Sequence, residues 1–216
     1  MVDGKEYPDP CDNAHVVTST THKVFRSERG GIILTNHEEL SKKFNTAVFP
    51  GYQGGPLMHV IAAKAAGFLE ALQPDFQDYI KSVLANAKIL AETLKNNGFK
   101  IYSDGTDTHL MLVDLRPYNV KGNLAAESLS RANITCNKNG IPFDTEKPMI
   151  TSGIRLGTQA ITTRGFGLNE CKKVGELITK TLKGLSENPD DNSKVEDEVR
   201  NEVIALTSSF PIYKNL

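Results

Sequence analysis

The sequence predicts an α/β fold in two parts, which a single long helix joins. Two short runs of β-branched and aliphatic residues, 16–21 and 31–35, are typical of strands buried on both faces of a helix-covered sheet. Residues 75–97 carry apolar side chains three and four positions apart, which indicates one amphipathic helix. Beyond residue 99, short apolar runs alternate with longer helical patterns, so we expect a second, α+β part there.

Length and composition indicate a soluble globular protein. The chain has 216 residues, of which 39% are hydrophobic and 24% charged, which are ordinary proportions for this class. Lys and Arg total 25 against 26 Asp and Glu, so the net charge of −1 gives no electrostatic basis for a nucleic-acid or membrane-surface partner. No apolar run approaches the roughly 20 residues of a membrane helix. The N-terminus contains no apolar stretch typical of a signal peptide.

Cysteine usage indicates a cytoplasmic protein. The three cysteines, Cys11, Cys136 and Cys171, are far apart, odd in number and form no CxxC pair. Neither a disulfide framework nor a zinc site is therefore indicated, and no metal is expected. We expect three free, structural thiols in a reducing compartment.

The N-terminal part, residues 1–74, begins as a loop and continues as strands and one helix. Two early prolines disfavour helix at the start. After the two strands, residues 49–56 form a loop dense in Gly and Pro. Residues 57–72 then follow a helical pattern, with Pro56 well placed at the first turn.

Residues 75–98 form the predicted linking helix. Gly98 supplies a C-terminal stop, because glycine adopts the left-handed backbone that ends many helices. The apolar stripe of the helix consists of Tyr79, Val83, Ala87, Leu90 and Leu94.

The C-terminal part, residues 99–216, is predicted to be a small α+β domain. Its predicted strands are 99–103, 109–115, 134–137 and 154–158, and its predicted helices are 124–132, 170–186 and 195–207. Ser193 and Glu196 have the spacing of a capping box, in which each side chain satisfies the other residue's backbone N–H.

Lys23 is the first candidate for chemistry. It follows a predicted strand, and ligands of α/β folds bind at the edge where strands end. Desolvation and nearby cations such as Arg26 and Arg29 depress the pKa of a lysine and expose a nucleophilic amine. Further hydroxyl and imidazole groups come from Thr20, Thr21 and His22. The alternative is an ordinary surface lysine at a strand end.

Two other segments have candidate binding roles. The glycines of residues 51–56 allow backbone N–H groups to approach a phosphate, although a tight turn before a helix explains them nearly as well. Arg155 lies within a predicted strand between small residues, and its planar fork suits a carboxylate. An internal salt bridge is the alternative for Arg155.

Four segments together resemble one enzyme family. Residues 16–23 (VVTSTTHK), 47–59 (AVFPGYQGGPLMH), 131–135 (RANIT) and 151–155 (TSGIR) strongly resemble serine hydroxymethyltransferase, in the same order. The resemblance extends over essentially the whole chain and is to the C-terminal portion of the family. It implies the aspartate aminotransferase-like fold of pyridoxal-phosphate enzymes. Residues 1–74 would then be part of the cofactor-binding large domain.

The resemblance implies roles for residues of the N-terminal part. Lys23 would hold pyridoxal 5'-phosphate as a Schiff base, with Thr20 beside the cofactor. His22 would lie near the cofactor phosphate and influence substrate specificity, and Arg29 would organise the surroundings of the lysine. Gly54 and Gly55 would donate backbone hydrogen bonds to the phosphate of a neighbouring subunit. A homodimer is therefore implied.

The resemblance also implies substrates. Arg155 would bind the amino-acid carboxylate, while Asn139 and the loop of Lys147, Pro148 and Met149 would contact folate. The family's reaction moves a one-carbon unit between serine and glycine, with tetrahydrofolate as the acceptor.

The resemblance departs from the family at two places. It begins in the middle of the family's chain, so a long N-terminal portion is expected to be missing. That portion contains the aspartate that pairs with the cofactor ring nitrogen and the histidine that stacks on the ring. In addition, residues 24–31 read VFRSERGG where the family usually has TLRGPRGG.

Two functions therefore remain open. The chain belongs to a working hydroxymethyltransferase, with a partner supplying the missing N-terminal half, or it is a non-catalytic remnant that acts as a folding or dimerisation module. Because exposed strand edges favour association, residues before 75 are expected to be less ordered or more oligomer-dependent than residues 99–216.

Overall fold

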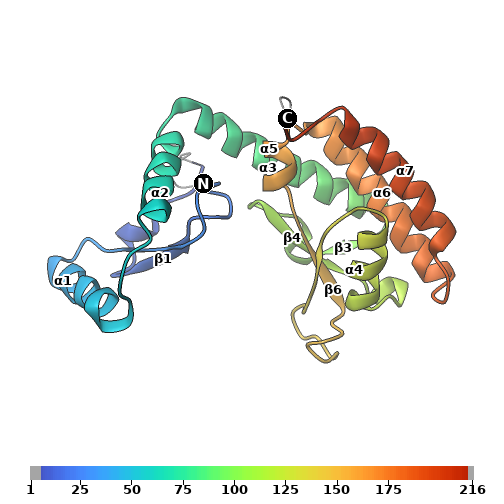
Figure 1. The fold of residues 1–216 in the computed structure, drawn as a ribbon. Helices are drawn as coiled ribbons and strands as arrows, with labels where there is room; N and C mark the ends of the chain where they lie inside the picture. Colours follow the sequence, from blue (N-terminus) through green and yellow to red (C-terminus); the bar gives the residue numbers. More distant parts are fainter. Residues whose placement is uncertain (1–5, 214–216) are drawn as a thin grey trace. The chain divides into compact units, whose positions relative to one another are not determined.

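The computed structural model describes residues 6–213. The extreme N-terminus, where no signal peptide is expected, lies outside the described residues. The chain divides into two compact units, Met1–Lys81 and Ser82–Leu216 (Figure 1). Helices and strands are both present, so the predicted mixed α/β class is confirmed.

The first unit contains a two-stranded antiparallel sheet. Strands β1 (Val17–Thr20) and β2 (Gly31–Leu34) pair along their whole length. Both strands confirm the predicted positions. The expectation that they are buried on both faces is wrong for the described residues, because Ile33 and Leu34 are 47% and 45% exposed. Continuous apolar residues indicate strands with other elements packed on both faces, and the first unit does not provide such elements for β2.

Helices follow the sheet in the first unit. After the short turn η1 (Pro10–Asp12) and the strands come α1 (Glu38–Thr46), the π-type turn η2 (Ala47–Tyr52) and α2 (Met58–Ala71). Helix α2 confirms the predicted helix over 57–72 to within one residue. Helix α1 was not predicted, since it is short, polar and without a buried residue.

Helix α3 (Pro74–Asn96) contributes to both units. All five predicted apolar positions of this helix are buried, which confirms its register. Gly98 has a φ of +96° directly after the helix, so the predicted stop is also correct.

The second unit is built on a four-stranded antiparallel sheet in the order β3-β4-β6-β5. Its strands are β3 (Lys100–Ile101), β4 (Leu110–Asp114), β5 (Asn137–Asn139) and β6 (Gly153–Gly157). The strand predicted at 134–137 is misplaced. Asn133 has a left-handed φ of +62°, and the Ile134 N–H donates to the Leu129 carbonyl, so this segment finishes the preceding helix instead.

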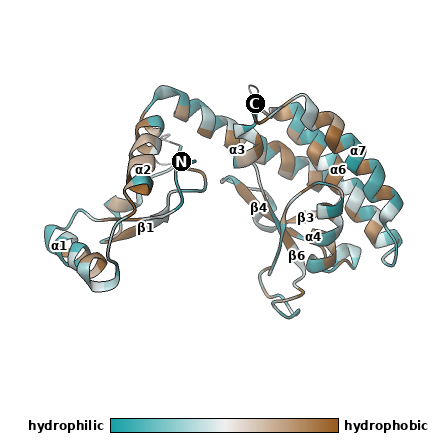
Figure 2. Cartoon of the chain, viewed as in Figure 1, coloured by the Kyte–Doolittle hydropathy of each residue, from teal (hydrophilic) through white to brown (hydrophobic). Residues whose placement is uncertain are grey.

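Helices and turns make up the rest of the second unit. The helices are α4 (Gly122–Arg131), α5 (Gln159–Thr163), α6 (Leu168–Glu187) and α7 (Ser193–Ser208), with short turns η3 (Tyr102–Asp104) and η4 (Arg116–Tyr118). Helix α7 packs on α6 and the end of α4, where Val199 clusters with Leu177 and Ala132. Figure 2 shows α6 alternating between hydrophobic and hydrophilic residues, as expected of an amphipathic helix. The core joins α3, α4 and α6 to the sheet through residues such as Leu90, Val113, Leu129, Ile154 and Leu182.

The predicted capping box at the start of α7 is wrong. Asn192 is the N-cap, without a capping side-chain hydrogen bond. The Glu196 carboxylate is only 3% exposed and pairs with Arg131 Nε at 2.6 Å. It also accepts a hydrogen bond of 2.6 Å from Ser128 Oγ. The Glu196 side chain, which the local spacing predicted to cap α7, therefore forms a tertiary ion pair with Arg131 instead.

Candidate functional site

A closed loop between β1 and β2 carries Lys23. Thr21 N–H donates to the Gly30 carbonyl at 3.0 Å, and Ser27 N–H donates to the Thr21 carbonyl at 2.9 Å. The Thr21 side chain is fully buried, and its hydroxyl donates to the carbonyls of Glu28 and Gly30. Thr21 therefore closes the base of the loop, and its hydroxyl is not available to a ligand as the sequence had suggested.

Lys23 itself is exposed at the turn of this loop. Its carbonyl accepts a 3.0 Å hydrogen bond from the Arg26 N–H. Within the described chain, its ammonium forms no hydrogen bond or ion pair. The backbone of the residue is therefore fixed, while the amine is accessible.

His22 and Arg29 lie together beside Lys23. Arg29 Nη1 is 3.3 Å from His22 Nε2, and the Gly30 N–H is 3.4 Å from His22 Nδ1. A neutral imidazole has one acceptor nitrogen, so only one of these contacts is a hydrogen bond at a time. The His22 ring therefore lies between the Arg29 guanidinium and the Gly30 backbone amide, and it accepts a hydrogen bond from one of the two.

Arg26 is not available as an anion-binding cation. Its guanidinium pairs with Glu70 at 2.5 Å and lies 4.0 Å from the centre of the Tyr79 ring. Nearby, the Phe25 ring makes an edge contact with Phe68 at 5.2 Å. These contacts attach the lysine loop to α2 and to the start of α3.

Gly54 and Gly55 lie in the exposed connection between η2 and α2. A Cβ atom built at either position meets nothing within 4 Å. Contacts inside the described chain therefore do not require glycine there, and the backbone is open to approach by another molecule.

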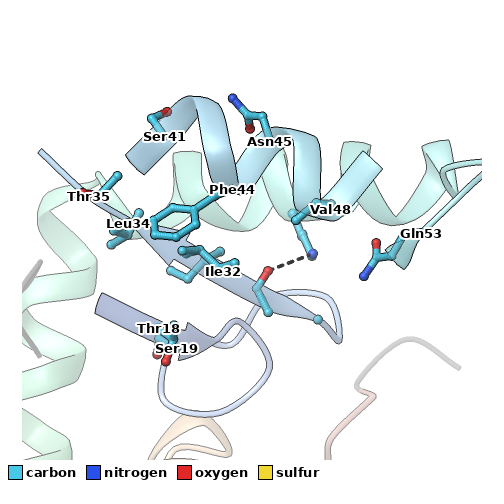
Figure 3. Close-up of a pocket in the computed structure, with 14 residues that line it drawn as sticks. Thr18, Ser19, Ile32, Leu34, Thr35, Ser41, Phe44, Asn45, Val48 and Gln53 are labelled. Atoms are coloured by element: carbon cyan, nitrogen blue, oxygen red, sulfur yellow. Dashed lines mark hydrogen bonds between the residues drawn. The ribbon is translucent and has the colours of Figure 1, made fainter. Parts of the chain in front are cut away.

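A pocket of about 820 Å³ lies between the sheet and α1 in the first unit. Figure 3 shows the Phe44 ring pointing toward Ile32 and Leu34. Lys64 Nζ donates to the Gly31 carbonyl at its edge, at 3.4 Å. Neither His22 nor Lys23 is among the lining residues, so this pocket marks the uncovered apolar face of β2.

Arg155 lies on β6 in the second unit, opposite Leu112 of β4 and Asn137 of β5. Its neighbours Ile154 and Leu156 point into the core, so Arg155 is on the exposed face of the sheet. Among the described residues it has no ion-pair partner, so the alternative of an internal salt bridge is not supported there.

The second unit also contains the predicted folate segment. Asn139 ends β5, and its side-chain amide donates to the Gly140 carbonyl at 2.6 Å. Lys147, Pro148 and Met149 lie in an exposed turn, and the Lys147 carbonyl accepts from Ile150 N–H at 2.8 Å. Asn139 is opposite Gly153 in the ladder that also places Arg155.

The predicted site residues thus form two groups. Thr20, His22, Lys23 and Arg29 belong to one strand–loop in the first unit, with Gly54 and Gly55 elsewhere in that unit. Asn139, Arg155 and the 147–149 turn belong to the second unit.

Comparison with known proteins shows to which protein family the chain belongs. The family model for serine hydroxymethyltransferase matches residues 1–178, which is most of the chain and includes every predicted site residue.

The chain belongs to the serine hydroxymethyltransferase family.

Curated relatives agree with this assignment. A serine hydroxymethyltransferase from Pelagibacter ubique is 86% identical over all 216 residues of the chain, which cover 50% of the relative. A serine hydroxymethyltransferase from Marinomonas sp. is 63% identical over 96% of the chain and 49% of its own length. The chain therefore spans about half the length of these hydroxymethyltransferases and corresponds to their C-terminal portion.

The chain differs from the usual hydroxymethyltransferase pattern in the lysine loop. Ser27 replaces the usual glycine and lies against α2, where a Cβ built on Gly67 would come within 2.2 Å of its hydroxyl. Glu28 replaces the usual proline, and its carboxylate accepts from the Arg29 N–H at 2.7 Å. Glu28 thus places a carboxylate at the backbone of Arg29 in the lysine loop.

The thiols of this family member are unsuited to nucleophilic chemistry. Burial raises the pKa of Cys136 to about 11 and that of Cys171 to about 12. All three cysteines are free, as predicted. Among residues 6–213, no group of three or more metal-ligating side chains comes together, and no helix is long and apolar enough to cross a membrane.

Two residues shape the site in ways that the sequence did not predict. Thr21, expected to offer its hydroxyl to a ligand, closes the lysine loop instead, and Asp144 organises the segment before β6. Thr21 is the last residue of the run from Thr18 to Thr21, and nothing in the sequence distinguishes its role from that of the other threonines. The Asp144 side chain could have been recognised only as a turn residue.

Proposed function

We propose that this chain takes part in serine–glycine interconversion, with tetrahydrofolate as the one-carbon acceptor and pyridoxal phosphate attached to Lys23. The observation that carries the proposal is the exposed amine of Lys23, unpaired among residues 6–213, on a loop whose base is closed by buried hydrogen bonds. A fixed backbone with a free amine is what attachment to an aldehyde requires.

The surrounding residues fit pyridoxal phosphate. The imidazole of His22 and the guanidinium of Arg29 contact each other on the same loop as Lys23, and both suit an anionic phosphate. Gly54 and Gly55 leave their backbone open, as needed for close approach to the phosphate of a neighbouring subunit. When bound, pyridoxal phosphate supplies a conjugated ring that delocalises negative charge developing on the amino acid.

The remaining residues bind and orient the substrates in this proposal. The Arg155 guanidinium would donate two parallel hydrogen bonds to the amino-acid carboxylate and so orient the substrate. Thr20 places a hydroxyl beside the cofactor. Asn139, Lys147, Pro148 and Met149 form the contact surface for tetrahydrofolate.

We also propose that the N-terminal half of the family's fold covers the first unit in the working protein. The curated relatives are about twice as long as this chain. The β2 residues Ile33 and Leu34 and the η2 residue Phe49 are exposed in the first unit, with Phe49 at 61%. Ile33 and Leu34 line the same pocket as the exposed Val48, and a shared exposed apolar surface of this kind favours a covering partner. The complementary half would also supply the cofactor-binding aspartate and histidine that the resemblance implies.

The test of the cofactor site is reductive labelling. The purified chain is mixed with pyridoxal phosphate, treated with borohydride and mapped by peptide mass. We expect a visible absorbance band that borohydride removes, and a label on the peptide containing Lys23. Lys23→Ala should remove the label, whereas Lys42→Ala, which deletes an exposed amine paired with Glu38, should retain it. An undiminished label in Lys23→Ala would show that the amine is not the attachment site.

The second test adds the N-terminal half of the Pelagibacter ubique relative. We expect this mixture to show a glycine-dependent spectral change and hydroxymethyl transfer. Labelling at Lys23 without any transfer in the mixture would instead support the non-catalytic module.

A further inference from the structure

A long loop, residues 140–152, connects β5 to β6 and carries the proposed folate contacts. The loop contains no helix or strand, yet its two ends are closely packed. A Cβ built on Gly153 would come within 2.5 Å of Ile141 Cγ2. The Gly122 N–H also donates to the Thr151 carbonyl at 2.9 Å, which fixes the end of the loop to the start of α4.

The Asp144 carboxylate is the centre of this loop. It accepts backbone hydrogen bonds from Ile141 at 3.2 Å and from Glu146 at 3.0 Å. It also accepts two from Ser152, one from the backbone at 2.9 Å and one from the hydroxyl at 2.7 Å. One side chain therefore joins the beginning, the middle and the end of the loop.

The charge on Asp144 is stable. Desolvation opposes ionisation, but the hydrogen bonds from Ser152, Glu146 and Ile141 hold the pKa of Asp144 far below its usual range. The carboxylate consequently accepts all four hydrogen bonds throughout the neutral pH range.

The loop backbone is strained in two places. Phe143 has a φ of +57° and Thr151 a φ of +62°, although bulky and β-branched side chains disfavour this region. Phe143 is 95% exposed, so packing of its own side chain does not offset the strain. Such a conformation persists only where surrounding bonds fix it, and the Asp144 hydrogen bonds lie directly beside both residues.

Arg155, in contrast, is positioned without Asp144. The ladder of β6 with β4 and β5 places it opposite Leu112 and Asn137. Loss of the Asp144 carboxylate should therefore disturb the 147–149 turn and leave the amino-acid carboxylate site in place.

We infer that Asp144 is a positioning residue that holds residues 140–152 in the conformation that binds tetrahydrofolate. This inference rests on the proposed function, because it deepens the role given to Lys147, Pro148 and Met149. Asp144 itself does not contact the substrate in this assignment.

The test compares Asp144→Asn with Glu146→Gln. The asparagine keeps the shape of the side chain but turns an amide N–H₂ toward backbone donors, so about half of the four hydrogen bonds are lost. Glu146→Gln alters an exposed ion pair with Lys121 in the same loop and leaves the backbone bond to Asp144 intact. Both variants are assayed as the full chain complexed with the N-terminal half.

We expect Asp144→Asn to raise the KM for tetrahydrofolate about tenfold, corresponding to about 1.4 kcal/mol. The KM for serine and kcat should change less than about twofold, and Glu146→Gln should resemble the unmodified protein. Equal increases in both KM values would overturn the inference, because they would indicate general damage to the second unit.

Hydrogen exchange on the full 216-residue chain provides a readout that does not depend on activity. Amides of Ile141, Glu146 and Ser152 should exchange faster in Asp144→Asn, with α6 unchanged. Unchanged exchange in the loop would overturn the inference even if the enzyme is active. Faster exchange in the loop together with no transfer by the unmodified complex would support the positioning role and reject the proposed function.

Discussion

At the residue scale, the lysine loop depends on a buried hydroxyl rather than on the lysine alone. Thr21→Val keeps the shape of the side chain but leaves the Glu28 and Gly30 carbonyls without that donor. Loss of a buried hydrogen bond costs about 1–3 kcal/mol. We expect the apparent affinity of Lys23 for pyridoxal phosphate to fall by about tenfold, measured by absorbance titration.

Thr18→Val is the matched control for this prediction. Thr18 is an exposed threonine on β1, the strand that leads into the loop, and its hydroxyl forms no hydrogen bond within the described residues. An equal loss of affinity in both variants would mean that the strand, and not the Thr21 hydroxyl, determines cofactor attachment.

The buried Glu196 gives a pH-dependent prediction. The hydrogen bond from Arg131 is the largest cause that lowers the pKa of Glu196, and the Ser128 hydroxyl adds to it. A carboxylate with a lowered pKa stabilises the fold above its unfolded pKa of about 4.3, and this stabilisation is lost as the pH falls through the folded value.

We therefore expect Glu196→Gln to lower the free energy of unfolding by about 2–3 kcal/mol at pH 7, as measured by urea denaturation. The difference from the unmodified chain should begin to shrink as the pH falls below the unfolded pKa of about 4.3, and it should disappear only below the lower folded pKa, where the glutamate is protonated in both states. Glu198→Gln, which alters only an exposed pair with Lys180, should change stability by less than about 1 kcal/mol at either pH. A difference that stayed constant across this pH range would exclude the ion pair as its origin.

At the element scale, the contact between α3 and α6 depends on a glycine. A Cβ built on Gly175 would lie 2.8 Å from Cγ2 and 2.9 Å from Cβ of Thr93. Thr93 cannot rotate away easily, because its hydroxyl donates to the Ile89 carbonyl at 2.7 Å. Overpacking costs about 1–3 kcal/mol and exceeds the gain of about 1 kcal/mol in helix propensity.

Gly175→Ala is consequently expected to destabilise the second unit by about 1–2 kcal/mol in thermal or urea unfolding. Lys172→Ala, on the exposed side of the same helix, should have little effect. A more stable Gly175→Ala variant would show that the two helices separate without cost.

The elements that the sequence predicted well are those with strong periodicity. The stripe from Tyr79 to Leu94 located α3 because each apolar residue on it is buried. Helices α1 and α5 were missed, since both are short and have no buried residue. The predicted cap at Glu196 failed because a partner distant in sequence competes for that carboxylate.

For the site residues as well, local sequence motifs could be recognised, whereas contacts with residues distant in sequence could not. The motif around Lys23 could be recognised in the sequence, and its assignment as a cofactor lysine stays a prediction. The ion pair of Arg26 with Glu70 and the four hydrogen bonds of Asp144 could not be predicted from the sequence, because they depend on tertiary contacts.

At the scale of the whole molecule, the two units differ in how much core they contain. Within residues 6–81, the buried hydrophobic side chains are Ala71, Phe76, Tyr79 and Ile80, and none comes from β1 or β2. The second unit contains a continuous core that joins its sheet to three helices. Local stability follows buried apolar contacts, so the strands of the first unit should open more readily.

Hydrogen exchange of the isolated chain should therefore be much faster in β1 and β2 than in β4 and β6. Adding the N-terminal half of a relative should slow exchange in β1 and β2 and leave the second unit unchanged. Equal protection of both units in a monomeric chain would contradict this prediction.

Helix α3 places a constraint on any attempt to divide the protein. Its first turns, within the first unit, contain the buried residues Phe76, Tyr79 and Ile80, and its later turns supply Ala87, Leu90 and Leu94 to the core of the second unit. The border between the units at Lys81 and Ser82 therefore runs through a continuous helix rather than a linker. A fragment designed for crystallography or spectroscopy should begin ahead of Pro74, because a cut at the border would leave a helix end with unsatisfied amides in place of its native start.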